Sequence, residues 1–88
     1  MQPPQSSAST GPVTVRYWAG ARRVAGRDSE RVHAADVAGL LAQLSDRSPA
    51  LARVLAASSI LVDTVASTPG QRLQPGAVVD VLPPFAGG

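Results

Sequence analysis

The segment Ala77–Leu82 constrains the fold more than any other part of the sequence. Its residues, Ala-Val-Val-Asp-Val-Leu, are nearly all apolar, which is typical of a central strand covered on at least one face. Asp80 interrupts the run, and a buried carboxylate is costly without a partner. We therefore expect Asp80 to lie at the edge of the apolar cover or to pair with a neighbouring side chain.

An alternating pattern at residues 13–18 predicts an earlier strand. Val13, Val15 and Tyr17 fall on one face of this strand, and the residues between them fall on the other. Its β-branched and aromatic residues suit a strand as well. The next predicted elements are, in order, a short helical turn at 19–25 closed by Gly26, a turn at 27–29 and a second strand at 30–34, antiparallel to the first.

Two helical segments follow. Asp36 is a good N-cap, and the apolar residues after it recur with helical spacing at Val37, Leu40, Leu41 and Leu44. Gly39 weakens this helix of about three turns, which we expect to end between residues 45 and 48. A shorter second helix begins with Ser48 as N-cap and Pro49 at the first helical position. Its inward face is formed by Leu51, Val54 and Leu55.

The later elements complete an α+β pattern. They are a strand at 59–63, turns at Pro69-Gly70 and Pro75-Gly76, a brief strand at 71–73 between them, and the final strand at 77–82. The economical arrangement is a β-grasp, or ubiquitin-like, fold in which the first and last strands pair in parallel through a right-handed crossover. One main helix and a short second helix would pack across this mixed sheet.

The sequence divides into three parts. Residues 1–12 are rich in Pro, Gln and Ser and carry no charged side chain, so we expect them to be a disordered lead-in. Residues 13–82 form the β-grasp domain, and residues 83–88 form an extended C-terminal tail. An 88-residue chain without cysteine is one small domain whose stability comes from its apolar core alone, because it has no disulfide and no thiolate metal ligand.

Composition also bears on which partners the protein can bind and on the cell compartment in which it is expected. The net charge is +2, every basic residue is Arg, and these arginines are too dispersed to predict nucleic-acid binding. No stretch approaches the roughly 20 apolar residues that span a membrane. The first residues lack the basic and apolar regions of a secretory signal, so we expect a cytoplasmic protein.

The body of the domain carries no recognisable catalytic set. His33 is the only histidine, so neither a zinc site nor a Ser-His-Asp triad is predicted, and no metal or bound cofactor is expected. The six carboxylates are scattered, with no pair at acid–base spacing. No Gly-rich phosphate loop opens a helix.

The chemistry is therefore expected in the final six residues, Pro83-Pro84-Phe85-Ala86-Gly87-Gly88. A carboxylate on Gly88, preceded by Gly87, is unhindered enough to be threaded into the active site of another protein. Pro83 and Pro84 favour an extended exit from the sheet and limit the entropy lost on threading. Phe85 is interpreted as an anchor for a pocket of a partner, or as a side chain that packs back on its own sheet.

Two segments of the sequence resemble the MoaD/ThiS family of ubiquitin-like sulfur carriers, and within it the branch of the molybdopterin synthase small subunit. The first, residues 13–26, is similar to the opening strand of that family, with Arg22 on its Arg and Arg23 where Glu is usual. The second, residues 73–88, carries Pro-Pro-x-x-Gly-Gly, and the Pro-Pro favours the molybdopterin branch over the thiamine branch. Departures from the family pattern occur at Ala77, Val78 and Asp63.

The resemblance implies a mechanism and a set of partners. A ubiquitin-activating-type adenylyltransferase would use ATP to adenylate Gly88, and a sulfurtransferase would supply sulfur for a thiocarboxylate. The charged carrier would then insert its tail, Pro83 to Ala86 setting the reach, into the large catalytic subunit of molybdopterin synthase. There the sulfur would pass to the pyranopterin precursor, so the chain would not be an enzyme on its own.

Three other functions stay open at the level of sequence. One is a sulfur carrier for another pathway, such as cysteine or thiamine biosynthesis. Another is a ubiquitin-like protein modifier whose Gly88 becomes an amide on a target lysine. The last is a binding module with an inert tail, and the diglycine argues against it.

Overall fold

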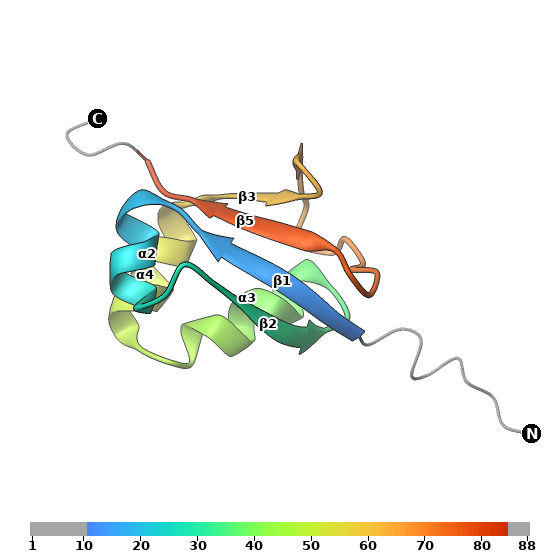
Figure 1. The fold of residues 1–88 in the computed structure, drawn as a ribbon, viewed down its shortest axis with the longest axis horizontal. Coiled ribbons are helices and arrows are strands. Elements are labelled where there is room, and N and C mark those ends of the chain that lie inside the picture. The colour runs from blue at the N-terminus through green and yellow to red at the C-terminus, as the bar shows by residue number, and fades with distance from the viewer. Residues whose placement is uncertain (1–10, 85–88) are drawn as a thin grey trace, which may run out of the picture.

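The computed structural model describes residues 11–84, which form one five-stranded sheet and three helices (Figure 1). The elements are, in chain order, β1 (Gly11–Tyr17), α2 (Ala19–Ala25), β2 (Ser29–Ala34), α3 (Val37–Ser45), α4 (Pro49–Ala57), β3 (Ser59–Val62), β4 (Val65–Ala66) and β5 (Val78–Leu82). Within the described residues, no helix has the length and apolar character needed to cross a membrane. Residues 1–10, most of the expected lead-in, and Phe85–Gly88 lie outside the described part of the chain. Residues 11 and 12, which were expected to belong to the disordered lead-in, instead begin β1 and pair with β2.

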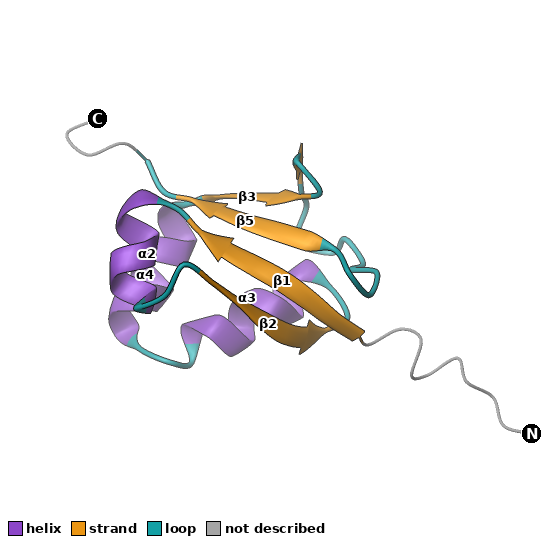
Figure 2. Ribbon diagram, in the orientation of Figure 1, coloured by secondary structure: helices purple, strands orange, loops and turns teal. Residues whose placement is uncertain are grey.

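The sheet confirms the predicted topology. Its strand order is β2-β1-β5-β3-β4, and β5 is parallel to β1 with Val15 opposite Val79. The β1·β2, β3·β5 and β3·β4 pairs are antiparallel. The first and last strands of the domain therefore lie side by side at the centre of the sheet, as Figure 2 shows.

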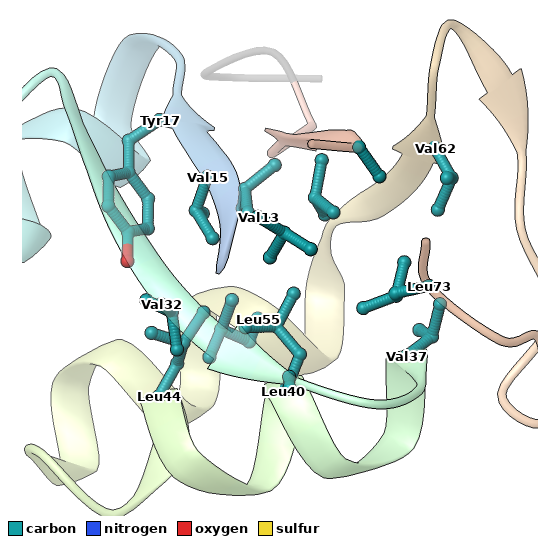
Figure 3. Packing of buried hydrophobic residues seen from close by; sticks show 14 of the residues in the cluster. Val13, Val15, Tyr17, Val32, Val37, Leu40, Leu44, Leu55, Val62 and Leu73 are labelled. Carbon is teal, nitrogen blue, oxygen red and sulfur yellow. The ribbon is translucent and has the colours of Figure 1, made fainter. Parts of the chain in front are cut away.

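The core lies between this sheet and the helices (Figure 3). Alternate residues of β1 point into it, and β5 contributes Val79 and Val81, both fully buried. Leu40 and Leu44 of α3 fill the space beneath them, as the helical spacing predicted. Sixteen side chains, all apolar apart from the hydroxyl of Tyr17, form this single buried cluster.

Both predicted caps are present. Asp36 accepts a hydrogen bond from the backbone nitrogen of Gly39 at 2.7 Å, and Ser48 accepts one from that of Leu51 at 3.0 Å. A Cβ at position 39 would lie 2.9 Å from the Asp36 carboxylate oxygen. The expected cost of Gly39 to the helix is thus accompanied by a benefit, because the missing side chain leaves room for the cap.

The helices differ in proportion from the expectation of one main helix and a short second one. Both α3 and α4 contain nine residues, and residues 19–25 form the seven-residue helix α2. The left-handed Gly26, with φ of 80°, closes α2 as predicted. The sheet is consequently covered by three short helices.

The predicted strand at 71–73 is wrong. Only an isolated bridge joins Arg72 to Asp36, and backbone hydrogen bonds tie residues 71 and 73 to the start of α3 instead. The additional strand is β4, which follows β3 through a tight turn in which Asp63 and Thr64 have φ of 49° and 73°. This turn lacks the Asn-Gly or Asp-Gly pair that usually marks such hairpins, so no clear local pattern predicts it.

Candidate functional site

The predicted tail leaves the domain from the end of its central strand. We refer to residues 82–84, Leu-Pro-Pro, as the tail root. Leu82 still pairs with Ser59 of β3, whereas Pro83 is half-buried and Pro84 is exposed. In Figure 1 the chain emerges here beside α2 and α4. The other predicted site residues, Phe85, Ala86, Gly87 and Gly88, lie outside the described residues.

The strand that carries the tail root is held on both sides. β5 pairs with β1 along one edge and with β3 along the other. The backbone nitrogen of Trp18 donates to the carbonyl of Val81 at 3.2 Å, which extends this support to the last residues of β5. Proline has no N–H with which to continue the ladder, so regular pairing stops at Pro83. The body of the domain therefore presents the tail from a fixed point.

A polar cluster formed by Arg16, Trp18 and Asp80 lies on the sheet face away from the helices; we call it the Asp80 cluster. Arg16 and Asp80 are opposite each other in the β1·β5 register. The guanidinium donates from Nε to Oδ1 at 2.6 Å and from Nη2 to Oδ2 at 2.9 Å, a bidentate arrangement. The indole nitrogen of Trp18 donates to Oδ1 at 2.8 Å. Asp80 is thus paired, as its place in an apolar strand predicted.

This environment keeps Asp80 ionised. The hydrogen bond from Arg16 lowers the pKa of Asp80; burial acts in the opposite direction, and the hydrogen bond from Trp18 and the charge of Arg16 add to the lowering. Trp18 stays 43% exposed, with the Arg16 guanidinium 5.6 Å from the centre of its ring. The cluster therefore fixes an exposed aromatic side chain and a cation close to the tail root.

A second polar network fixes the other edge of β1. Tyr17 donates its hydroxyl hydrogen to Glu30 of β2 at 2.6 Å, and Arg47 donates to both oxygens of the same carboxylate at 2.6 Å. Burial alone would raise the pKa of Glu30, but the hydrogen bonds from Arg47 and Tyr17 outweigh it, so the pKa is lowered. Burial and the Glu30 contact raise the pKa of Tyr17. This network joins two strands to the connection between α3 and α4.

Comparison with known proteins identifies the family. The model of the ThiS family matches residues 15–88, which includes nearly all of the domain and the diglycine. The chain belongs to the ThiS family. No curated protein sequence matches it significantly.

Solved structures similar to this ThiS-family chain share its fold. One is a putative molybdopterin converting factor, subunit 1, from Pyrococcus furiosus, with 27% identity, a TM-score of 0.77, and coverage of 85% of this chain and 99% of that one. Another is SAMP1 from Haloferax volcanii, with 27% identity, a TM-score of 0.77, and coverage of 89% and 100%. A third, from a complex of subunits 1 and 2 of the Helicobacter pylori molybdopterin-converting factor, has 24% identity, a TM-score of 0.69, and coverage of 88% and 99%, and shows the fold alone.

Residues 11–84 of this ThiS-family member hold no group of three His, Cys, Asp or Glu side chains that could bind a metal. His33 is exposed on β2. The two networks were only partly foreseeable: the apolar run around Asp80 indicated a partner for it, but alternation alone did not identify Arg16 and Trp18 as that partner. The Tyr17–Glu30–Arg47 contacts could not be predicted from a local sequence pattern, because they join residues far apart in the chain.

Proposed function

We propose that this ThiS-family chain is a sulfur carrier that serves as the small subunit of molybdopterin synthase. In this proposal Gly88 is adenylated, converted to a thiocarboxylate and used to donate sulfur to a pyranopterin precursor. The observation that carries the proposal is the family match up to residue 88, together with a tail root mounted on the central strand.

The proposed chemistry begins with activation of a poor electrophile. The Gly88 carboxylate attacks the α-phosphate of ATP on an adenylyltransferase, which gives an acyl adenylate and releases pyrophosphate. A sulfide equivalent from a sulfurtransferase then attacks the acyl carbon, and AMP leaves with the electron pair of the broken bond. The product is a thiocarboxylate whose sulfur is nucleophilic at neutral pH.

The contribution of the chain is to present this group. Pro83 and Pro84 restrict the backbone where the tail leaves the sheet, so less entropy is lost when the tail enters another protein. Gly87 and Gly88 carry no side chain that would obstruct a narrow channel. The general acids and bases belong to the adenylyltransferase and to the large catalytic subunit, in keeping with a small protein that works within a complex.

The molybdopterin branch is favoured by two observations. One is the Pro-Pro-x-x-Gly-Gly segment at residues 83–88. The other is the similarity to the Pyrococcus furiosus protein described as a molybdopterin converting factor subunit. The complex of subunits 1 and 2 from Helicobacter pylori supports a heteromeric assembly for proteins of this fold.

A second candidate function is protein modification through Gly88. It is favoured by equal similarity to SAMP1 of Haloferax volcanii, and a SAMP1 described as a small archaeal modifier protein, from Methanosarcina acetivorans, shares the fold with a TM-score of 0.79. In that function the acyl adenylate would be passed on to a target lysine. This chain has no lysine, so it could not be extended into chains through its own ε-amines.

Reconstitution distinguishes the two functions. The thiocarboxylated chain is mixed with the organism's own large subunit and the pyranopterin precursor, and molybdopterin is measured by its fluorescent oxidation product. The proposal predicts molybdopterin formation in proportion to thiocarboxylate, and none with a variant that lacks Gly88. Reductant-resistant conjugates in cell lysate, without molybdopterin in the mixture, would favour the modifier instead.

A further inference from the structure

A groove lies beside the tail root on the helical side of the domain. We call it the helix-side groove; its apolar lining consists of Val24 of α2, Ala50, Val54 and Ala57 of α4, and Pro83 and Pro84. It has a volume of about 430 Å³. Val24 is 39% exposed, although valine is more often buried. The groove is separate from the Asp80 cluster, which lies on the opposite face of the sheet.

One charged side chain, Arg53, lines this groove. The two helices that form its walls carry no acidic residue, and Arg23 adds a positive charge on α2, whereas Arg22 lines a different hollow with Arg16 and Trp18. Arg22 lies 3.6 Å from Asp28, but within residues 11–84 neither Arg23 nor Arg53 has a carboxylate at ion-pair distance. A complementary surface would therefore be apolar at its centre and acidic at its rim.

The length of the tail determines how closely a partner must approach. From Pro84 to the carboxylate of Gly88 there are four residues, which span at most about 14 Å when fully extended. An enzyme that reacts with Gly88 must bring its active site within that distance of Pro84. Because active sites are recessed, the surface around the entrance would then contact the tail root and the groove that includes Pro83 and Pro84.

We propose that the helix-side groove is a docking site for the adenylating enzyme that activates Gly88. The enzyme would place an apolar side chain between Val24 and Ala57, with a neighbouring carboxylate paired to Arg53. This inference rests on the proposed function, and it places the contact surface on the side of the tail root away from Trp18.

The test uses two matched pairs of variants of the full chain. Ala50→Glu places a carboxylate in the groove, and Ala56→Glu places one on the same helix at an exposed position that does not line it. Arg53→Glu reverses the charge at the groove, and Arg72→Glu does so in the loop that precedes β5, at the other end of that strand from the tail root. Thermal unfolding of each variant confirms that it is folded.

Affinity for the organism's own adenylating enzyme is measured by isothermal titration calorimetry. We expect Ala50→Glu and Arg53→Glu to raise the Kd by about tenfold or more, because each places a negative charge opposite an acidic surface. The controls Ala56→Glu and Arg72→Glu should stay within about twofold of the unmodified chain. Folded groove variants that bind within the same twofold range would overturn the proposal.

Two further outcomes are informative. Nuclear Overhauser effects from the ring of Phe85 to the methyl groups of Val24 and Ala57 that persist in the complex would assign the groove to the chain's own tail, and would also overturn the proposal. Failure of the unmodified chain to form an acyl adenylate and release pyrophosphate with the enzyme and ATP would refute the proposed function. Normal activation of unmodified chain and groove variants alike would refute the docking site alone.

Discussion

The Tyr17–Glu30 hydrogen bond should contribute measurably to stability. Tyr17 is 2% exposed and donates to the Glu30 carboxylate at 2.6 Å. A hydrogen bond to a charged group contributes about 1.5–3 kcal/mol, and its loss leaves the buried hydroxyl unpaired. The Arg47 side chain is 43% exposed, so its pairing with Glu30 adds only about 0.2–1 kcal/mol. We therefore expect Glu30→Ala to lower the free energy of unfolding by about 2–4 kcal/mol.

A double-mutant cycle separates this bond from the rest of the network. Tyr17→Phe removes only the hydroxyl and leaves Glu30 with Arg47, so it should cost about 1–2 kcal/mol. Once Glu30 is absent the hydroxyl has no acceptor, and removing it then costs little. The double variant should accordingly be more stable than the sum of the single effects predicts, by about 1–2 kcal/mol.

Urea unfolding at neutral pH measures all three variants. The midpoints should shift while the slope of the free energy against urea concentration stays constant, as for a change in native-state stability. Glu30→Gln is the control, because it keeps an acceptor for Tyr17 and removes the charge; it should cost less than Glu30→Ala. Additivity of the two single effects within about 0.5 kcal/mol would show that the bond carries no coupling and would refute the reasoning.

Two other predictions follow from the carboxylates. Because the folded-state pKa values of Glu30 and Asp80 are lowered, their stabilisation is complete above the unfolded-state values of about 4 and is lost as pH falls through the lowered values. Urea midpoints between neutral and acidic pH should therefore fall on acidification, and the fall should be smaller in a Glu30→Gln, Asp80→Asn double variant; an equal fall would contradict this. Gly39→Ala gains about 1 kcal/mol of helix propensity but displaces the Asp36 cap, which is of similar value, so its net effect on the unfolding free energy should be near zero. In an Asp36→Ala background the same change should be stabilising by about 1 kcal/mol, and no gain there would refute the steric argument.

The elements that the sequence predicted well are those with a local physical signal. The alternation at residues 13–18 and the apolar run at 77–82 correspond to β1 and β5, and the caps at Asp36 and Ser48 begin α3 and α4. Parallel pairing of the first and last strands followed from the order of the elements.

The elements that it missed depend on contacts between distant residues. β4 exists because the backbone turns through positive φ at Asp63 and Thr64, and Asp63 is held there by a hydrogen bond from the backbone nitrogen of Val78 at 2.9 Å. The turn signals around residues 71–73 predict a brief strand, but the backbone hydrogen bonds of this segment go to the start of α3. The same limit applies to the site: the position of the tail root was predictable, whereas the helix-side groove needed the packing of α2 on α4.

The central claim is that the reactive group of this protein is the carboxylate of Gly88. Its most direct test is the intact mass of the chain after incubation with the adenylating enzyme, ATP, a sulfurtransferase and a sulfur source. We expect the mass increase of one oxygen exchanged for one sulfur, located at Gly88 by fragmentation and absent from a variant that lacks this residue. An unchanged mass under conditions in which a known carrier is converted, or sulfur found at another residue, would contradict the account.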